Sequence, residues 1–195
     1  MTTCHFCSRL LKALPRIFIR MRMFTMTLAL AGSLIAPAVE GQVRPGIAVQ
    51  KAAMEKIRFL AGTWTGDAVI SSGTGNQITL RQTEEVQYKL DGLLMVIEGT
   101  GRDDAGKIVF NAFAVISFDQ SMGSYRIRAW NEGNFVETEM KVEGSKFEWG
   151  FQRGPLTVFD RMELDEQGRW SEVSEATLAD GRKVHSVKMI LSRKP

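Results

Sequence analysis

At Phe59-Leu60-Ala61-Gly62-Thr63-Trp64-Thr65-Gly66, the hydrophobic pattern of the chain changes its period. Before this stretch, apolar residues between Ile47 and Leu60 recur at the spacing of one short amphipathic helix. After Gly62, apolar and polar residues alternate with the period of two that is typical of β-strands. The pattern therefore predicts a short N-terminal helix followed by a domain made of strands.

Strand-like runs fill the rest of the chain and are separated by turn signals such as Asp91-Gly92, Gly154-Pro155 and Asp180-Gly181. We expect strands at 63–70, 77–88, 93–101, 107–118, 125–131, 135–142, 146–152, 157–164, 170–177 and 183–192. Short links without intervening helices predict an antiparallel meander, and a meander of this length removes its exposed edges by closing on itself. The expected fold is all-β, a single antiparallel barrel of about ten strands, with the domain spanning residues 47–195.

Gly62, Trp64 and Gly66 form the motif at the start of the first predicted strand. The two glycines let the chain bend and approach neighbouring backbone closely, and Trp64 is large enough to close the end of a barrel. Because it follows a helical turn, this motif resembles the entry motif of the lipocalins and other calycins. Over residues 50–195 the chain is similar to two groups: the exported bacterial family called domain of unknown function 1579, and nitrobindin, a ten-stranded barrel that binds heme.

This resemblance implies a lipocalin-like barrel and roles for two further residues. In lipocalin-like chains a basic residue late in the last strand, here Arg193, lies over the tryptophan in a cation–π contact. In nitrobindin a histidine of the last strand is the axial heme ligand, and His185 has that place here. Heme is therefore one expected alternative for the ligand, although the favoured expectation is a barrel without a cofactor.

The first 38 residues have the three parts of a secretory signal peptide. Basic residues precede the uncharged apolar run 23–39, and Ala36-Pro37-Ala38 fits the small-x-small cleavage pattern. We expect cleavage after Ala38, a linker over 39–46 and export to the periplasm or cell exterior of a bacterium; an uncleaved anchor is the alternative. Met21 would itself begin a tidy leader, so residues 1–20 are consistent with a mis-called start.

The distribution of charge argues against nucleic acid as a partner. The whole chain has 25 basic and 22 acidic residues and a formal net charge of +3. Five basic and no acidic residues fall in 1–38, so the remainder carries 20 basic and 22 acidic residues. A weakly acidic domain has no electrostatic attraction to phosphate backbones. After cleavage of the leader we expect no membrane association either.

Catalytic motifs are absent from the sequence. Both cysteines, Cys4 and Cys7, lie in the predicted leader, and His185 is the one histidine after it. No Gly-x-Ser-x-Gly or His-Glu-x-x-His motif occurs, and a site of several histidines is excluded by their number. We therefore expect a binding protein rather than an enzyme.

Alternation also predicts which side chains line the interior. One face of strand 146–152 carries three aromatic residues, and one face of strand 183–192 carries His185 with apolar neighbours. The candidate lining residues are Phe147, Trp149, Phe151, His185, Val187 and Met189. Arg126, Arg128 and Trp130 share a face of another strand, for which the pattern favours the outside; facing inward, the arginines would hold an anionic head group.

Three functions remain open from the sequence. The favoured one is an exported, non-catalytic protein that holds one small apolar or amphipathic ligand inside the barrel. The second is a heme barrel with His185 as axial ligand. The third is a barrel filled by its own side chains that acts as a structural or protein-interaction module. Strand Ile108–Phe118 is apolar on both faces, so we expect the N-terminal helix or a homodimer contact to cover its outer face.

Overall fold

The computed structural model describes residues 45–72 and 74–195. The predicted signal peptide and residues 39–44 of the predicted linker lie outside the described residues. Within the described part, helix α1 spans Pro45–Glu55 and a 3-10 turn, η1, spans Arg58–Leu60. The helix begins two residues earlier than its apolar spacing predicts, because the fixed backbone angle of Pro45 suits the first helical position.

The strands follow η1 in chain order and match the predicted runs to within two residues at each end. They are β1 (Gly62–Ser72), β2 (Gln77–Lys89), β3 (Leu94–Arg102), β4 (Ile108–Asp119), β5 (Ser124–Asn131), β6 (Asn134–Glu143), β7 (Lys146–Arg153), β8 (Leu156–Leu164), β9 (Trp170–Leu178) and β10 (Lys183–Arg193). A 3-10 turn, η2 (Leu90–Gly92), joins β2 to β3.

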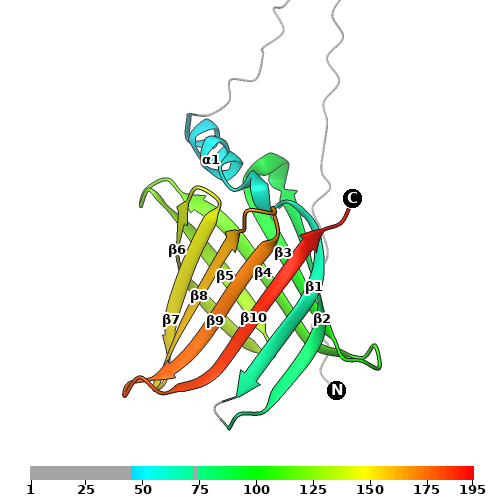
Figure 1. Cartoon of the computed structure of the whole chain (residues 1–195). Coiled ribbons are helices and arrows are strands. Elements are labelled where there is room, and N and C mark those ends of the chain that lie inside the picture. The colour runs from blue at the N-terminus through cyan, green and yellow to red at the C-terminus, as the bar shows by residue number, and fades with distance from the viewer. Residues whose placement is uncertain (1–44, 73) are drawn as a thin grey trace, which may run out of the picture. The chain divides into compact units, whose positions relative to one another are not determined.

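Each strand pairs antiparallel with the next, and β1 pairs with β10, so the sheet closes into a barrel of ten strands. This confirms the predicted fold class. Figure 1 shows α1 above one end of the barrel, with the hairpins β1–β2, β3–β4, β5–β6, β7–β8 and β9–β10 at the other. We call these the helix end and the hairpin end.

Two tyrosines hold α1 at the helix end. The hydroxyl of Tyr125 donates a 2.6 Å hydrogen bond to the carbonyl of Ala53, and that of Tyr88 donates one of the same length to Met54. Each carbonyl also accepts a backbone N–H at the end of the helix, from Lys56 and Ile57 respectively, so each tyrosine adds a second hydrogen bond. The helix is thereby tied to β2 and β5, with Met54 and Ile57 fully buried.

The entry motif builds the junction between η1 and the barrel. A Cβ at Gly66 would lie 2.0 Å from the carbonyl oxygen of Ile190, so β1 and β10 can cross this closely only at glycine. Gly62 has a φ of +130°, a backbone conformation that residues with side chains rarely adopt. The Arg193 guanidinium lies 4.1 Å from the centre of the Trp64 ring and donates hydrogen bonds to the carbonyls of Phe59 and Ala61.

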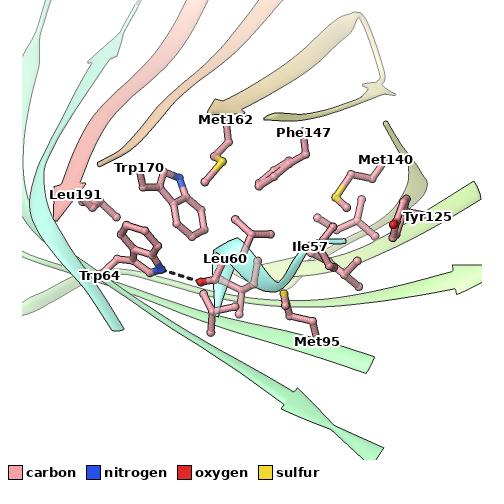
Figure 2. Close-up of a cluster of buried hydrophobic side chains, with 14 of the residues drawn as sticks. Ile57, Leu60, Trp64, Met95, Tyr125, Met140, Phe147, Met162, Trp170 and Leu191 are labelled. Atoms are coloured by element: carbon pink, nitrogen blue, oxygen red, sulfur yellow. Dashed lines mark hydrogen bonds between the residues drawn. The ribbon is translucent and has the colours of Figure 1, made fainter. Parts of the chain in front are cut away.

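Buried hydrophobic side chains fill the helix end of the barrel (Figure 2). Trp64 donates a 2.7 Å hydrogen bond from Nε1 to the carbonyl of Leu60 and packs edge-on against Trp170 at 5.7 Å between ring centres. Phe147 also packs edge-on against Trp170, with 6.2 Å between the ring centres. This aromatic layer separates the filled helix end from the hairpin end.

The outer face carries the arginines of β5 and the apolar side chains of β4. Arg126 and Arg128 both form ion pairs with Glu137 of β6, which confirms the outward reading and excludes an anion-binding role inside the barrel. On β4, Val109 and Phe113 remain 39% and 37% exposed. The helix therefore does not cover them, and a homodimer contact there stays a prediction.

Candidate ligand-binding site

A cavity of about 340 Å³ occupies the hairpin end of the barrel. Its inner boundary is the aromatic layer, because Trp170 and Phe147 belong both to the hydrophobic cluster and to the cavity wall. Its outer boundary includes Arg153 and Phe135, which are exposed. The cavity thus runs from the middle of the barrel to solvent.

The wall of the cavity is mainly apolar and comes from every strand. Its apolar side chains include Ala68, Ile70, Leu80, Ile97, Phe110, Ala112, Ala114, Ile127, Ala129, Val136, Val158 and Val187. Four of these are alanines, and three of the four lie on β4 and β5. Small side chains on these strands leave the space that a larger residue would fill.

Five of the six residues predicted from alternation lie on this wall: Phe147, Trp149, Phe151, Val187 and Met189. Trp149 and Phe151 stack with a ring separation of 5.7 Å. The period of two therefore assigns their faces, while their contact with a ligand stays a prediction. The side chain of the sixth, His185, is outside the described part of the structure; its backbone pairs with Ser72 and Ala176.

Three carboxyl groups also line the cavity: Glu84 of β2, Asp160 of β8 and Glu172 of β9. We call them the carboxyl cluster. Glu84 and Asp160 are each only 6% exposed. Asp160 pairs with Ser174 across the sheet and Met162 pairs with Glu172, so the two carboxyls project inward as diagonal neighbours. Glu84 approaches from another part of the wall, because three strands of the closed sheet (β1, β10 and β9) separate β2 from β8 in one direction and five in the other.

Neighbouring side chains orient this cluster. Trp170 donates a 2.7 Å hydrogen bond from Nε1 to Oε2 of Glu172, and Gln82 donates one of 2.7 Å from Nε2 to Oε1 of Glu84. Asp160 interacts with Ser174 and Glu172, but its Oδ1 is buried without a hydrogen-bond partner among the described residues. The cluster therefore keeps one free acceptor in a buried position.

Two glycines of β3 make room for the polar side chains of β2. Gly99 pairs with Glu84 and Gly101 pairs with Gln82. A Cβ at Gly99 would lie 2.8 Å from Oε1 of Glu84, and one at Gly101 would lie 2.7 Å from Oε1 of Gln82. The wall is thus shaped to hold a carboxyl and an amide where the alternation would otherwise place apolar side chains.

Burial makes all three carboxyls weak acids. Loss of hydration raises the pKa of Glu84 to about 7, against the lowering effect of the Gln82 hydrogen bond. Loss of hydration likewise raises the pKa of Asp160 to about 6. The pKa of Glu172 lies well above its ordinary value, first because of burial and then because Asp160 and Glu84 are close. Such groups can bind a cation, or donate and accept protons near neutral pH.

No residue of the carboxyl cluster is among the candidate site residues predicted from the sequence. Alternation along the strands could have indicated these positions. Glu84 shares a strand face with Leu80 and Val86, and Glu172 shares one with Trp170. Glycines on the paired positions of β3 were the second signal.

Two further features bear on the kind of site. No group of three or more His, Cys, Asp or Glu side chains among residues 45–72 and 74–195 is arranged to hold a metal ion. In the same ranges, no helix has both the length and the hydropathy needed to cross a bilayer.

Solved structures share this fold at low sequence identity. Rv2717c from M. tuberculosis superposes with a TM-score of 0.57 at 11% identity, covering 73% of this chain and 98% of its own. The S-type phycobiliprotein lyase CPES from Guillardia theta superposes with a TM-score of 0.54 at 9% identity, covering 73% of this chain and 93% of its own. No protein-family model matches the chain, and no curated protein matches it in sequence.

These neighbours place the chain among the ten-stranded, calycin-like β-barrels. They also correct one expectation. The lack of catalytic motifs predicted a protein that is not an enzyme, and this prediction is wrong. The same barrel serves as a lyase in Guillardia theta, so the lack of a familiar catalytic motif does not exclude catalysis on this scaffold.

Proposed function

We propose that the barrel binds one small amphipathic molecule in the cavity at its hairpin end. The observation that carries this proposal is a cavity of about 340 Å³ with an apolar wall and a few convergent polar groups at its inner end. Ligand pockets in proteins have this composition and volumes of roughly 300–1,000 Å³. The cavity is at the small end of that range, which favours a ligand of modest size.

The third function considered from the sequence, a barrel filled by its own side chains, describes only the helix end. There, Trp64, Trp170 and Leu191 are at most 2% exposed and leave no room for a ligand. The alanines of β4 and β5 at the other end do leave room. A binding role therefore accounts for both halves of the interior, whereas a scaffold role accounts for one.

The test is to fill the cavity and measure the loss of binding. Ala129 lies on the cavity wall, so we expect Ala129→Trp to occupy the space that a ligand needs. The neutral fluorophore prodan, which brightens and shifts to the blue in apolar surroundings, is titrated into wild type and variant. We expect saturable one-to-one binding to wild type, weakened at least tenfold by the substitution.

Ala105 supplies the matched control. It is exposed in the turn between β3 and β4, so Ala105→Trp adds the same side chain outside the barrel and should leave prodan binding unchanged. Equal binding by both variants and wild type would show that prodan binds elsewhere and would overturn the proposal. Circular dichroism of each variant shows whether the barrel is intact.

The finer family resemblances also belong to this proposal. The motif Gly62-x-Trp64-x-Gly66 supports kinship with domain of unknown function 1579 or with nitrobindin. The described cavity wall does not by itself fit heme: its buried ionisable groups are carboxyls, which repel the two carboxylates of a heme, and it contains no described histidine. A hemin titration of wild type and His185→Ala decides the point, since a Soret band lost in the variant would establish heme.

We propose in addition that the protein is exported to the bacterial periplasm or beyond. The support is the sequence of residues 1–38, with its basic start, apolar run and Ala36-Pro37-Ala38 cleavage pattern. Mass spectrometry of the protein from a periplasmic fraction tests this, because cleavage predicts a mature chain beginning at Val39. A chain that keeps residues 1–38 and stays with the cytoplasmic fraction would contradict export.

A further inference from the structure

The described wall of the cavity carries more acidic than basic side chains. Among the described residues of the cavity wall, the carboxyl cluster is accompanied by three amides, Gln82, Asn131 and Asn134, and by one cation, Arg153. Arg153 bonds Asn134 near the hairpin end and lies four residues along β7 from Trp149, the cross-strand partner of Asp160. That is roughly 13 Å at the rise of a β-strand, too far for an ion pair with the cluster.

The arginines that do form ion pairs form them on the outside. Arg126 and Arg128 pair with Glu137, and Arg161 pairs with Glu148. None of the ion pairs within the described ranges involves Glu84, Asp160 or Glu172. A buried carboxylate is costly unless a donor or cation accompanies it. The described residues therefore provide no ion-pair partner for these interior acids.

Oδ1 of Asp160 is a second and independent indication of a ligand. The side chain is 6% exposed, lines the cavity, and its Oδ1 has no hydrogen-bond partner among the described residues. Buried polar atoms are nearly always paired, so an exception calls for a missing partner. A donor group bound at the inner end of the cavity would supply one.

From this geometry we infer that the ligand is an organic cation: an ammonium or amidinium group that donates hydrogen bonds to the carboxyl cluster, attached to an apolar body that lies along the wall. The inference rests on the proposed function and names the chemical class of its ligand. The head group lies at the level of Asp160 and Glu172, and the apolar part extends past Trp149 and Phe151 toward the hairpin end. Charge-assisted hydrogen bonds of this kind are among the strongest in proteins.

Three probes with the same ten-carbon chain separate charge from apolar binding: decylammonium, decanol and decanoate. Each is titrated calorimetrically into the full-length protein at pH 8. We expect decylammonium to bind about tenfold or more tightly than decanol, and decanoate to bind most weakly because the cluster repels its carboxylate. If decanol binds as tightly as decylammonium, the inference fails while the proposed function stands. If none of the three binds, both fail.

Removal of the acids tests which residues recognise the cation. In the triple variant Glu84→Gln, Asp160→Asn, Glu172→Gln we expect decylammonium to lose its advantage over decanol, while decanol binds as in wild type. Glu84 has an exposed neighbour on the opposite face of β2, Glu85, and Glu85→Gln is the matched control. Unchanged preference for decylammonium in the triple variant would overturn the assignment, and decanol binding reports that its barrel is intact.

Proton linkage gives a third measurement on the same site. Decylammonium stays protonated between pH 5.5 and pH 8, whereas the carboxyls lose protons across this range, with the pKa of Asp160 at about 6 and that of Glu84 at about 7. Its affinity should therefore rise with pH, and that of decanol should not. His185 is the one histidine after residue 38; the rise must persist in His185→Ala, and its loss there would assign the effect to the histidine.

Discussion

The indole Nε1 of Trp170 donates a 2.7 Å hydrogen bond to Oε2 of Glu172, two residues along the same strand. Trp170 is 2% exposed and packs edge-on against both Trp64 and Phe147. One side chain therefore closes the filled half of the barrel and orients a carboxyl in the hollow half. Packing and site chemistry are coupled at this residue.

Trp170→Phe should affect both halves of the barrel. The smaller ring leaves a gap beside Trp64 and removes the hydrogen bond, so we expect a loss of about 1–3 kcal/mol in the free energy of unfolding. The same bond holds down the pKa of Glu172, which should rise further when it is lost. Chemical denaturation and carboxyl-selective NMR titration measure the two effects.

Trp130 offers the control for that experiment, because its side chain is 41% exposed. Trp130→Phe should change the free energy of unfolding by less than about 0.5 kcal/mol. An equal loss in both variants would show that Trp170 has no special place in the packing.

Glu84→Gln should change how stability depends on pH. The pKa of Glu84 is about 7 in the folded protein against an ordinary value of 4.5. Below pH 4.5 the carboxyl is neutral whether the chain is folded or not, and its stabilising contribution is fully present. As the pH rises through 7, that contribution is lost, because the folded protein must ionise a buried group. The variant has no such loss.

Relative to wild type, the free energy of unfolding of Glu84→Gln should therefore increase between pH 5 and pH 8, on the order of 2 kcal/mol. Urea denaturation at several pH values measures it. Glu85→Gln, which removes an exposed carboxyl from the outer face of the same strand, is the comparison. The same pH-dependent gain in that variant would contradict the burial of Glu84 as the cause.

Arg193→Met should weaken the junction between η1 and the barrel. Methionine keeps an apolar stem over Trp64 but loses the cation–π contact and the hydrogen bonds to Phe59 and Ala61. We expect a loss of about 1–2 kcal/mol, seen by thermal denaturation. Arg81→Met is the control, because both side chains of the Arg81–Asp67 ion pair are exposed. It should lower the free energy of unfolding by less than about 0.5 kcal/mol.

Gly66→Ala should be more damaging than any of these. The added Cβ would lie 2.0 Å from the carbonyl oxygen of Ile190, so β1 and β10 must separate at the closure of the barrel. We expect a loss of about 3 kcal/mol or more. At Gly46 of α1 the nearest atom is the side-chain oxygen of Gln120, which can move. Gly46→Ala should therefore have little effect, and comparable losses at both glycines would contradict the close crossing.

Most of the fold could be predicted because turn residues and alternation are local properties of the sequence. Asp91-Gly92 and Asp180-Gly181 mark the turns between β2 and β3 and between β9 and β10, and the aromatic residues of β7 reveal their inward face by their spacing. The pairing of β1 with β10 could also be predicted, because closing a long meander into a barrel pairs the hydrogen-bonding groups of its two edge strands.

The carboxyl cluster could not be predicted by the same rule. Alternation assigns charged residues to the solvent side, and Glu84, Asp160 and Glu172 violate it in the same place from three strands. On β8 the inward face carries Val158, Asp160 and Met162. Because a charged residue lies between two apolar ones, the pattern does not identify this face as the inward one. Functional sites are where local patterns and burial disagree, and only the closed barrel shows that the three exceptions meet.

The most direct test of a ligand site inside the barrel is to mark what a small amphipathic molecule touches. An alkyl alcohol of ten carbons carrying a diazirine is photolysed with the full-length protein, and the labelled residues are mapped by mass spectrometry. The account predicts labels on cavity residues such as Trp149, Phe151 and Met189, with competition by unlabelled decanol. Labels confined to the exposed outer residues Val109 and Ile190, or labels that decanol does not displace, would contradict it.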